Sequence, residues 1–175
     1  YGPCVVAPTL MYHHIQDMET AKAAGNGFLT VTPETFQGQM QYVRDKGYSV
    51  TGVKELKAFF DQGIALPAKP LLLTFDDGYS DFASNGEPIL NEFGYTAMMF
   101  LPTGLVDNPG YLTWEQVNGM AGRVYFANHT WSHKDVAGAK DMAEKEIGLA
   151  NEQLMQRGLN PEKIFAYPYG DERGF

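Results

Sequence analysis

Cysteine is nearly missing from this chain, since Cys4 is the only one among 175 residues. A single thiol cannot form a disulfide within the chain, and it cannot supply the thiolates of a cysteine-rich zinc site. Histidine is also scarce, and its four positions are His13, His14, His129 and His133. Any metal site that uses imidazole ligands must therefore draw on these four.

Other missing features exclude further classes of protein. No run of about 18 apolar residues occurs, so we expect no transmembrane segment. No glycine-rich loop ending in lysine occurs either, which argues against a phosphoryl-transfer enzyme. Basic residues number 13 against 21 acidic ones, which gives a formal charge of −8. Such a surface repels nucleic acid, whereas it tolerates a sugar polymer, and it also aids solubility.

Strand-like and helix-like segments alternate along the chain. Apolar segments predict strands at 8–12, 48–51, 71–75, 95–101, 123–127 and 164–167. Apolar residues at helical spacing predict helices at 33–46, 53–62, 88–93, 113–121 and 141–157. We therefore expect an α/β fold with about 6–7 parallel strands, in a distorted or incomplete (β/α) barrel. A doubly wound sheet is the alternative.

Two adjacent acids, Asp76 and Asp77, follow an apolar predicted strand and precede Gly78. Active sites of α/β folds form at the carboxyl ends of strands. Neighbouring side chains of a straight strand point to opposite faces, but Gly78 permits a turn that brings both carboxylates toward one site. The same residues also form ordinary turns and helix caps, so the pair alone does not identify a site.

Two histidines, His129 and His133, follow the strand predicted at 123–127. Their spacing lets both imidazoles reach one ion, on a helical turn or on a tight loop, although two surface histidines would show the same pattern. Together with one acid of the pair they supply three ligands and leave a fourth position for water, as in catalytic zinc sites. The second acid is then available to activate that water.

The segments TFDDG, HTWSH and YPYG, in this order, resemble the motifs of the polysaccharide deacetylase family (carbohydrate esterase family four). The resemblance extends over about residues 71–170. It implies that Asp76 is the general base, and that Asp77, His129 and His133 hold a divalent metal. Zinc is the first expectation for that metal, with cobalt or nickel as alternatives.

The third segment contains Pro168 and Tyr169. Proline has no amide hydrogen, whereas the amide of Tyr169 can donate to an oxyanion, although the segment alone would be interpreted as a plain loop. The resemblance implies that both residues line the acetate pocket, and that Thr130 steadies the second motif. The family often carries arginine where this chain has Ala166, which leaves open what tunes the base.

The segment LMYHHI at 10–15 resembles the strand end of a permuted subgroup of this family. That subgroup includes the enzymes that de-N-acetylate the poly-β-1,6-N-acetylglucosamine of biofilms. The resemblance implies that His13 is the general acid, although a buried structural histidine is the alternative. His14 should point the other way along the strand. Tyr111 and Trp114 resemble an aromatic stretch of the subgroup and would stack on sugar rings or pack in the core.

The resemblance implies metal-dependent hydrolysis of N-acetyl groups from an N-acetylglucosamine polysaccharide, with poly-β-1,6-N-acetylglucosamine as first substrate. Peptidoglycan or chitin deacetylation, or glycan binding without turnover, are alternatives. It also implies a secreted, periplasmic or cell-surface location, with cell-surface association. We expect residues 1–175 to form a single catalytic domain. Family members continue with further strands after the third motif, so truncation at the C-terminus is an alternative.

Overall fold

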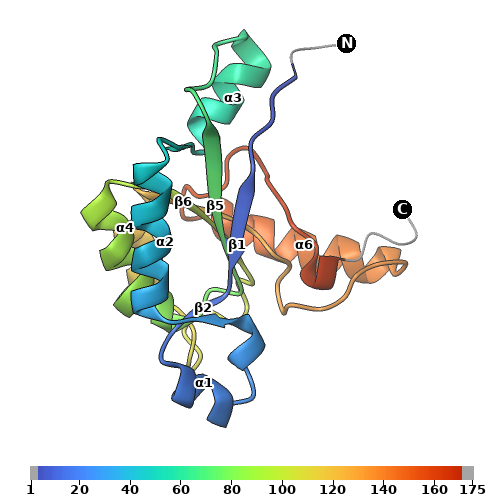
Figure 1. Cartoon of the computed structure of the whole chain (residues 1–175). Helices are drawn as coiled ribbons and strands as arrows, with labels where there is room; N and C mark the ends of the chain where they lie inside the picture. Colours follow the sequence, from blue (N-terminus) through green and yellow to red (C-terminus); the bar gives the residue numbers. More distant parts are fainter. Residues whose placement is uncertain (1–3, 171–175) are drawn as a thin grey trace. The chain divides into compact units, whose positions relative to one another are not determined.

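A computed structural model describes residues 4–170, whose strands and helices alternate along the chain (Figure 1). The strands are β1 (Thr9–Tyr12), β2 (His14–Ile15), β3 (Thr30–Val31), β4 (Ser49–Val50), β5 (Pro70–Asp76), β6 (Ala97–Leu101) and β7 (Val124–Asn128). The α-helices are α1 (Met18–Ala23), α2 (Pro33–Asp45), α3 (Val53–Gln62), α4 (Glu87–Phe93), α5 (Trp114–Met120) and α6 (Lys140–Met155). Short helical turns of other types lie at Gly27–Leu29, Phe82–Gly86 and Pro168–Gly170.

The main sheet has five strands in the hydrogen-bonded order β1-β5-β6-β7, with β4 also paired to β5. Both β1 and β4 run parallel to β5, and the short β2 and β3 form a separate parallel pair. The expected α/β class with parallel strands is therefore confirmed. The main sheet has fewer strands than the six or seven that the sequence predicted.

The strand predicted at 164–167 is wrong, which accounts for part of this difference. Within that stretch, Phe165 forms an isolated bridge to Asn128 at the end of β7. The Asn160 side chain bonds both the amide and the carbonyl of Ile164, and Pro168 has no amide hydrogen to donate. Asn160 before the stretch and Pro168 after it limit the pairing to the single bridge at Phe165. The strands of residues 4–170 therefore do not close a barrel.

Contacts between residues divide the chain into two compact units. Unit 1 comprises the residues up to Phe75 together with Asp81–Met98. Unit 2 comprises Asp76–Ser80 together with the residues from Met99 onward. Both segments of the predicted metal site therefore belong to unit 2, whereas His13 belongs to unit 1.

Aromatic rings form the centre of unit 1. Tyr12 packs edge-on against Phe36 with ring centroids 5.0 Å apart, and Phe75 lies 4.6 Å from Phe82. Burial raises the pKa of Tyr12 to about 12, and its hydroxyl donates to Gln39. Tyr12 and Phe75 are register partners in β1 and β5, so this packing fixes the carboxyl ends of both strands.

Helix α6 packs against β7 in unit 2. Its buried residues include Ala143, Ala150 and Leu154, which share the face that helical spacing predicted to be apolar. Phe126, in β7, is also buried. The helix thereby covers the strand whose end leads into His129, which places α6 beside the second motif.

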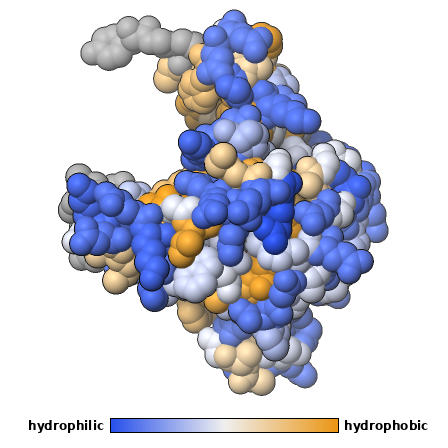
Figure 2. All heavy atoms as spheres, turned by 180° about the vertical axis from the view of Figure 1, so that it is seen from behind, coloured by the Kyte–Doolittle hydropathy of each residue, from blue (hydrophilic) through white to orange (hydrophobic). Residues whose placement is uncertain are grey.

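Within residues 4–170, no helix combines the length and the apolar character that crossing a membrane requires. The face seen in Figure 2 is mostly hydrophilic, with apolar residues in scattered patches.

Candidate metal centre

Asp77, His129 and His133 lie together in unit 2. One ligand atom from each side chain lies within 4.8 Å of the other two. The Oδ1 atom of Asp77 is 2.9 Å from Nε2 of His133 and 3.5 Å from Nε2 of His129. The structure therefore brings together the three residues that the sequence predicted as metal ligands. Their role as ligands stays a prediction.

The chain turns sharply at Asp77, directly after β5. Asp77 and Gly78 both adopt left-handed backbone conformations, with φ of 71° and 68°. A Cβ atom on Gly78 would lie 2.4 Å from Cδ1 of Leu101, so both the conformation and the available space favour glycine. For a residue with a side chain the same conformation costs about 1–2 kcal/mol, which the surroundings of Asp77 must offset. The half-buried Asp76 is the last residue of β5.

The second-motif loop, residues 129–133, is a tight loop and not a helical turn. Thr130 and His133 both have positive φ, at 67° and 55°. Nδ1 of His129 lies 2.9 Å from the carbonyl oxygen of Ala166. A carbonyl can only accept a hydrogen bond, so Nδ1 carries the hydrogen and Nε2 of the neutral ring keeps its lone pair on the side of Asp77.

The atoms that face one another here suit a cation. Oδ1 of Asp77 is buried and accepts no hydrogen bond, and the lone pair of His129 Nε2 lies beside it. These two groups both attract a cation, whereas neither supplies a hydrogen to the other. Burial raises the pKa of the Asp77 carboxyl, but the two imidazoles, when they are protonated and donate to it, lower that pKa by more, to well below its usual range. One carboxylate with two imidazoles is a donor set that zinc accepts.

Asn128 is a buried polar residue of this site that the sequence interpretation missed. Its side-chain amide donates to the Ile147 carbonyl and to Oδ1 of Asn151, both on α6. Its own Oδ1 accepts from the amide of Thr130 at 2.7 Å. Asn128 thus ties the start of the second-motif loop to α6. Its position directly before His129, at the end of an apolar strand, was the signal available in the sequence.

Glu146 is a second residue that the sequence interpretation missed. It is buried on α6, where it accepts hydrogen bonds from Ser132 of the second-motif loop. Its position three residues after Ala143 and four before Ala150 places a charged residue on the apolar face of the helix. That misplaced charge was the available signal, although it does not name the partner.

The third motif ends in a short 3₁₀ turn in which Pro168 is buried and Tyr169 is 72% exposed. Tyr169 has a φ of 65°, and its ring meets the ring of His133 edge-on with centroids 4.9 Å apart. The third motif therefore lies next to a predicted ligand. The donation of the Tyr169 amide to an oxyanion stays a prediction.

Thr130 is fully buried within the second-motif loop. Its carbonyl accepts from the amide of Thr103, and its own amide donates to Asn128. These contacts hold the loop from inside unit 2. The hydroxyl oxygen, through which the resemblance implies that Thr130 steadies the loop, is buried and has no hydrogen-bond partner among residues 4–170, so that role stays a prediction.

Comparison with known proteins identifies the family. Residues 63–173 match the family model described as polysaccharide deacetylase. The chain belongs to the polysaccharide deacetylase family. Among curated proteins, it is 28% identical over 165 residues to YxkH of Bacillus subtilis. It is 30% identical over 141 residues to the poly-beta-1,6-N-acetyl-D-glucosamine N-deacetylase of Escherichia coli K12.

The alignment with YxkH covers 93% of this chain and 56% of YxkH. The alignment with the Escherichia coli enzyme covers 70% of this chain and 20% of that enzyme. Among solved structures, the Streptococcus pyogenes deacetylase PplD, in complex with acetate, superposes with a TM-score of 0.83 at 31% identity. That match covers 94% of this chain and 74% of PplD. The α/β fold is therefore shared along nearly the whole chain.

Ala166 stands where members of the polysaccharide deacetylase family often carry arginine. The backbone of Ala166 still takes part in the site, because its carbonyl orients His129 and its amide donates to the Asn128 carbonyl. The methyl side chain offers no charge to Asp76. The support that the family arginine gives to the base is thus not supplied from this position.

His13 and His14 lie in unit 1 of this family member. His13 directly follows β1 and lines a hollow of about 430 Å³ together with Tyr12 and Phe28. His14 is buried, with Nδ1 2.6 Å from Oδ2 of Asp81 and Nε2 3.2 Å from the Asn26 amide. The opposite orientation of His14 along the strand stays a prediction. The role of His13 as an acid stays a prediction.

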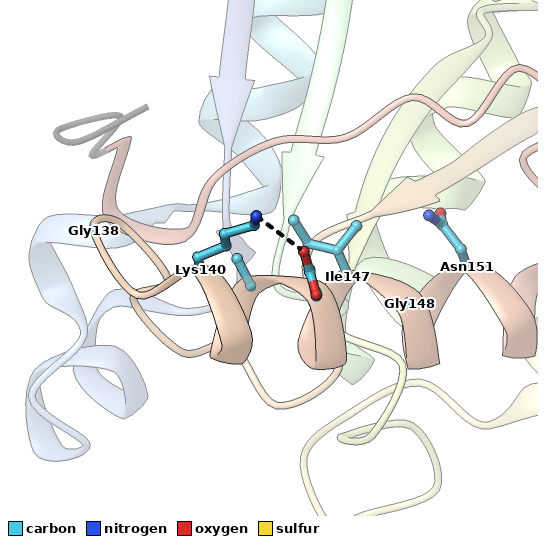
Figure 3. A pocket seen from close by; sticks show the side chains of 7 residues that line it. Gly138, Lys140, Ile147, Gly148 and Asn151 are labelled. Carbon is cyan, nitrogen blue, oxygen red and sulfur yellow. Dashed lines mark ion pairs between the residues drawn. The ribbon is translucent and has the colours of Figure 1, made fainter.

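Another hollow, of about 550 Å³, runs along α6 in unit 2 (Figure 3). Its lining residues are Gly138, Lys140, Ala143, Glu144, Ile147, Gly148 and Asn151. None of them belongs to the cluster of Asp77, His129 and His133. Asn151, which lines this hollow, is also the residue that accepts a hydrogen bond from Asn128.

Proposed function

We propose that this chain is a metal-dependent N-deacetylase that hydrolyses the N-acetyl groups of an N-acetylglucosamine polymer and releases acetate. The convergence of Asp77, His129 and His133, with Asp76 directly before the carboxylate ligand, carries the proposal. Three protein ligands leave a coordination position for water, and a neighbouring carboxylate is what activation of that water requires. Glycan binding alone would need neither.

Each residue of the site has a distinct proposed role. When bound, a zinc ion, or cobalt or nickel in its place, would lower the pKa of a coordinated water and polarise the acetamide carbonyl. Asp76 accepts the proton of the attacking water. The Tyr169 amide donates to the oxygen on which negative charge develops, and Pro168 shapes the pocket beside it. Thr130 keeps the second-motif loop in place.

The leaving sugar amine needs a proton, and we assign its transfer to His13. His13 directly follows β1, in unit 1. The carboxyl ends of parallel strands are where α/β enzymes gather their catalytic groups. The resemblance of the segment at 10–15 to the permuted subgroup supports this assignment.

Poly-β-1,6-N-acetylglucosamine is the proposed substrate. The Escherichia coli relative, 30% identical over 141 residues, is named for activity on this polymer. The acetate bound in the PplD complex supports acetate as the product. Peptidoglycan or chitin would require the same chemistry with a different groove. Such substrates imply a secreted, periplasmic or cell-surface location, with association of the chain to the cell surface.

We further propose that the chain forms one catalytic domain. The family match at 63–173 includes residues of both unit 1 and unit 2, which supports their joint membership of that domain.

Acetate release from defined acetylated glucosamine oligomers tests the proposed function. We expect acetate from β-1,6-linked oligomers, loss of activity with a chelator, and recovery on addition of zinc. Faster release from β-1,4-linked oligomers would move the substrate to chitin or peptidoglycan. Activity that a chelator leaves unchanged would contradict the metal role.

A carbohydrate-binding relative without turnover is the second candidate, because Ala166 replaces the arginine that supports the base in the family. Detectable glycan binding, with no acetate released in the presence of zinc or cobalt, would favour this function over hydrolysis.

A further inference from the structure

Glu146 is a buried carboxylate for which the proposed chemistry has no use. Its residue is 3% exposed, on α6. Oε2 accepts from the amide of Ser132 at 2.7 Å, and Oε1 accepts from the Ser132 hydroxyl at 2.8 Å. Nζ of Lys134 lies 3.7 Å from Oε1. A buried carboxylate is costly without partners, and here both oxygens are satisfied by one loop.

The loop that Glu146 binds is the one that carries both histidines of the candidate centre. Ser132 lies between His129 and His133 and directly precedes the latter. His133 has a positive φ of 55°, a conformation that residues with a side chain adopt uncommonly and at a cost in energy. The hydrogen bonds to Ser132 fix the backbone immediately before this strained residue.

A second contact from α6 holds the other arm of the same loop. Asn151 accepts from Asn128, whose Oδ1 accepts from the amide of Thr130 directly after His129. The residue next to each histidine therefore has its backbone amide held from α6. Thr130, after His129, donates to Asn128, and Ser132, before His133, donates to Glu146. The two contacts together resist a change in the distance between the imidazoles.

We propose that Glu146 is a positioning residue for the metal centre, and that it holds His133 at the distance from Asp77 that a shared cation requires. This inference rests on the proposed metal-binding function. Partners of metal ligands that fix their orientation commonly contribute about 10–100-fold to metal affinity. A merely structural role would change the stability of the metal-free protein and leave the affinity of the folded protein unchanged.

Zinc affinity, measured by competition with a chromophoric chelator, tests the proposal when it is combined with urea unfolding of the metal-free protein. The variants are Glu146→Ala and Glu146→Gln, with Glu144→Gln as the control. Glu144 lies on the same helix, is exposed, lines the hollow along α6, and pairs with Lys140 at 3.9 Å. It therefore matches the loss of one charge from α6 without any contact with the second-motif loop.

We expect Glu146→Ala to lower zinc affinity about 10–100-fold, because the amide and the hydroxyl of Ser132 both lose their acceptor atoms on Glu146. Glu146→Gln should recover part of the affinity, since its amide oxygen still accepts from the Ser132 amide and its amino group can donate to the hydroxyl. Glu144→Gln should bind zinc like the unmodified chain. Equal affinity of a folded Glu146→Ala protein and the unmodified chain would overturn the proposal.

If Glu146→Ala does not fold, Ser132→Ala takes its place, because it removes only the hydroxyl contact. A loss of zinc affinity of about 3–10-fold is then expected, and an unchanged affinity overturns the proposal. Absence of zinc binding by the unmodified chain would instead reject the proposed metal function, and the positioning role of Glu146 with it.

Discussion

Asp76 and Asp77 carry the same side chain and are neighbours in the sequence, yet their surroundings differ. Asp77 is buried, has a left-handed backbone and faces two imidazoles, whereas Asp76 is half-buried at the end of β5. We therefore predict different defects from the same substitution. Asp77→Asn should abolish tight zinc binding. Asp76→Asn should retain zinc but lower kcat about 10²–10⁴-fold, through loss of the base.

Zinc affinity and kcat for acetate release, measured on both variants, check this division of roles. Asp61→Asn is the control, because Asp61 is an exposed acid on the surface of α3, where it pairs with Lys57. Loss of zinc binding in Asp76→Asn, with zinc retained in Asp77→Asn, would reverse the assignment.

The residues of the candidate site differ in how far the sequence could predict them. One acid of the Asp76–Asp77 pair could be grouped with His129 and His133 because a carboxylate and two imidazoles form a common metal donor set, and the family resemblance then selected Asp77. Asn128 and Glu146 could not, since their function depends on hydrogen-bond partners that only the folded chain brings near. An asparagine or glutamate does not indicate its partner by its own chemistry.

At the scale of elements, local signals predicted the helices better than the last strand. Helix α3 has the predicted bounds and ends at Gly63, which adopts φ of 70°. Helix α5 starts after Thr113, whose side chain caps it. The stretch at 164–167 depends instead on partners elsewhere in the chain, and its apolar pattern does not report the competing bonds from Asn160. Strand formation is a long-range property, so it was the weaker prediction.

The turn after β5 yields a prediction about stability. Gly78→Ala should destabilise the protein by about 1–3 kcal/mol, because φ is 68° there and the new Cβ would meet Leu101. Gly119→Ala in α5 is the matched control, since a Cβ at this position would have nothing within 4 Å, and alanine in a helix should stabilise by about 0.5–1 kcal/mol. Urea unfolding of both variants measures the difference. Equal stability of the two would show that the turn tolerates a side chain.

At the scale of the whole molecule, the alternation of strands and helices was enough to predict the α/β class. The division into two units was not predictable, because it reflects the density of contacts between distant segments. The order of the three motifs was informative, since each follows a segment predicted as a strand. The order of the motifs therefore predicted that each lies after a strand, although the third of these strands is only an isolated bridge between Phe165 and Asn128.

Metal binding should also be visible in the stability of the whole chain. The cluster joins Asp77 to His129 and His133, which lie more than fifty residues further along the sequence. A cation that binds only the folded state adds about 2.7 kcal/mol at a hundredfold excess over Kd, which raises Tm by about 5–10 °C for a chain of this size. We therefore expect zinc to raise Tm, a chelator to reverse the rise, and Asp77→Asn to show no shift in thermal unfolding followed by circular dichroism. An equal rise in Asp77→Asn would place the stabilising ion elsewhere, because that variant lacks the carboxylate that joins the two segments.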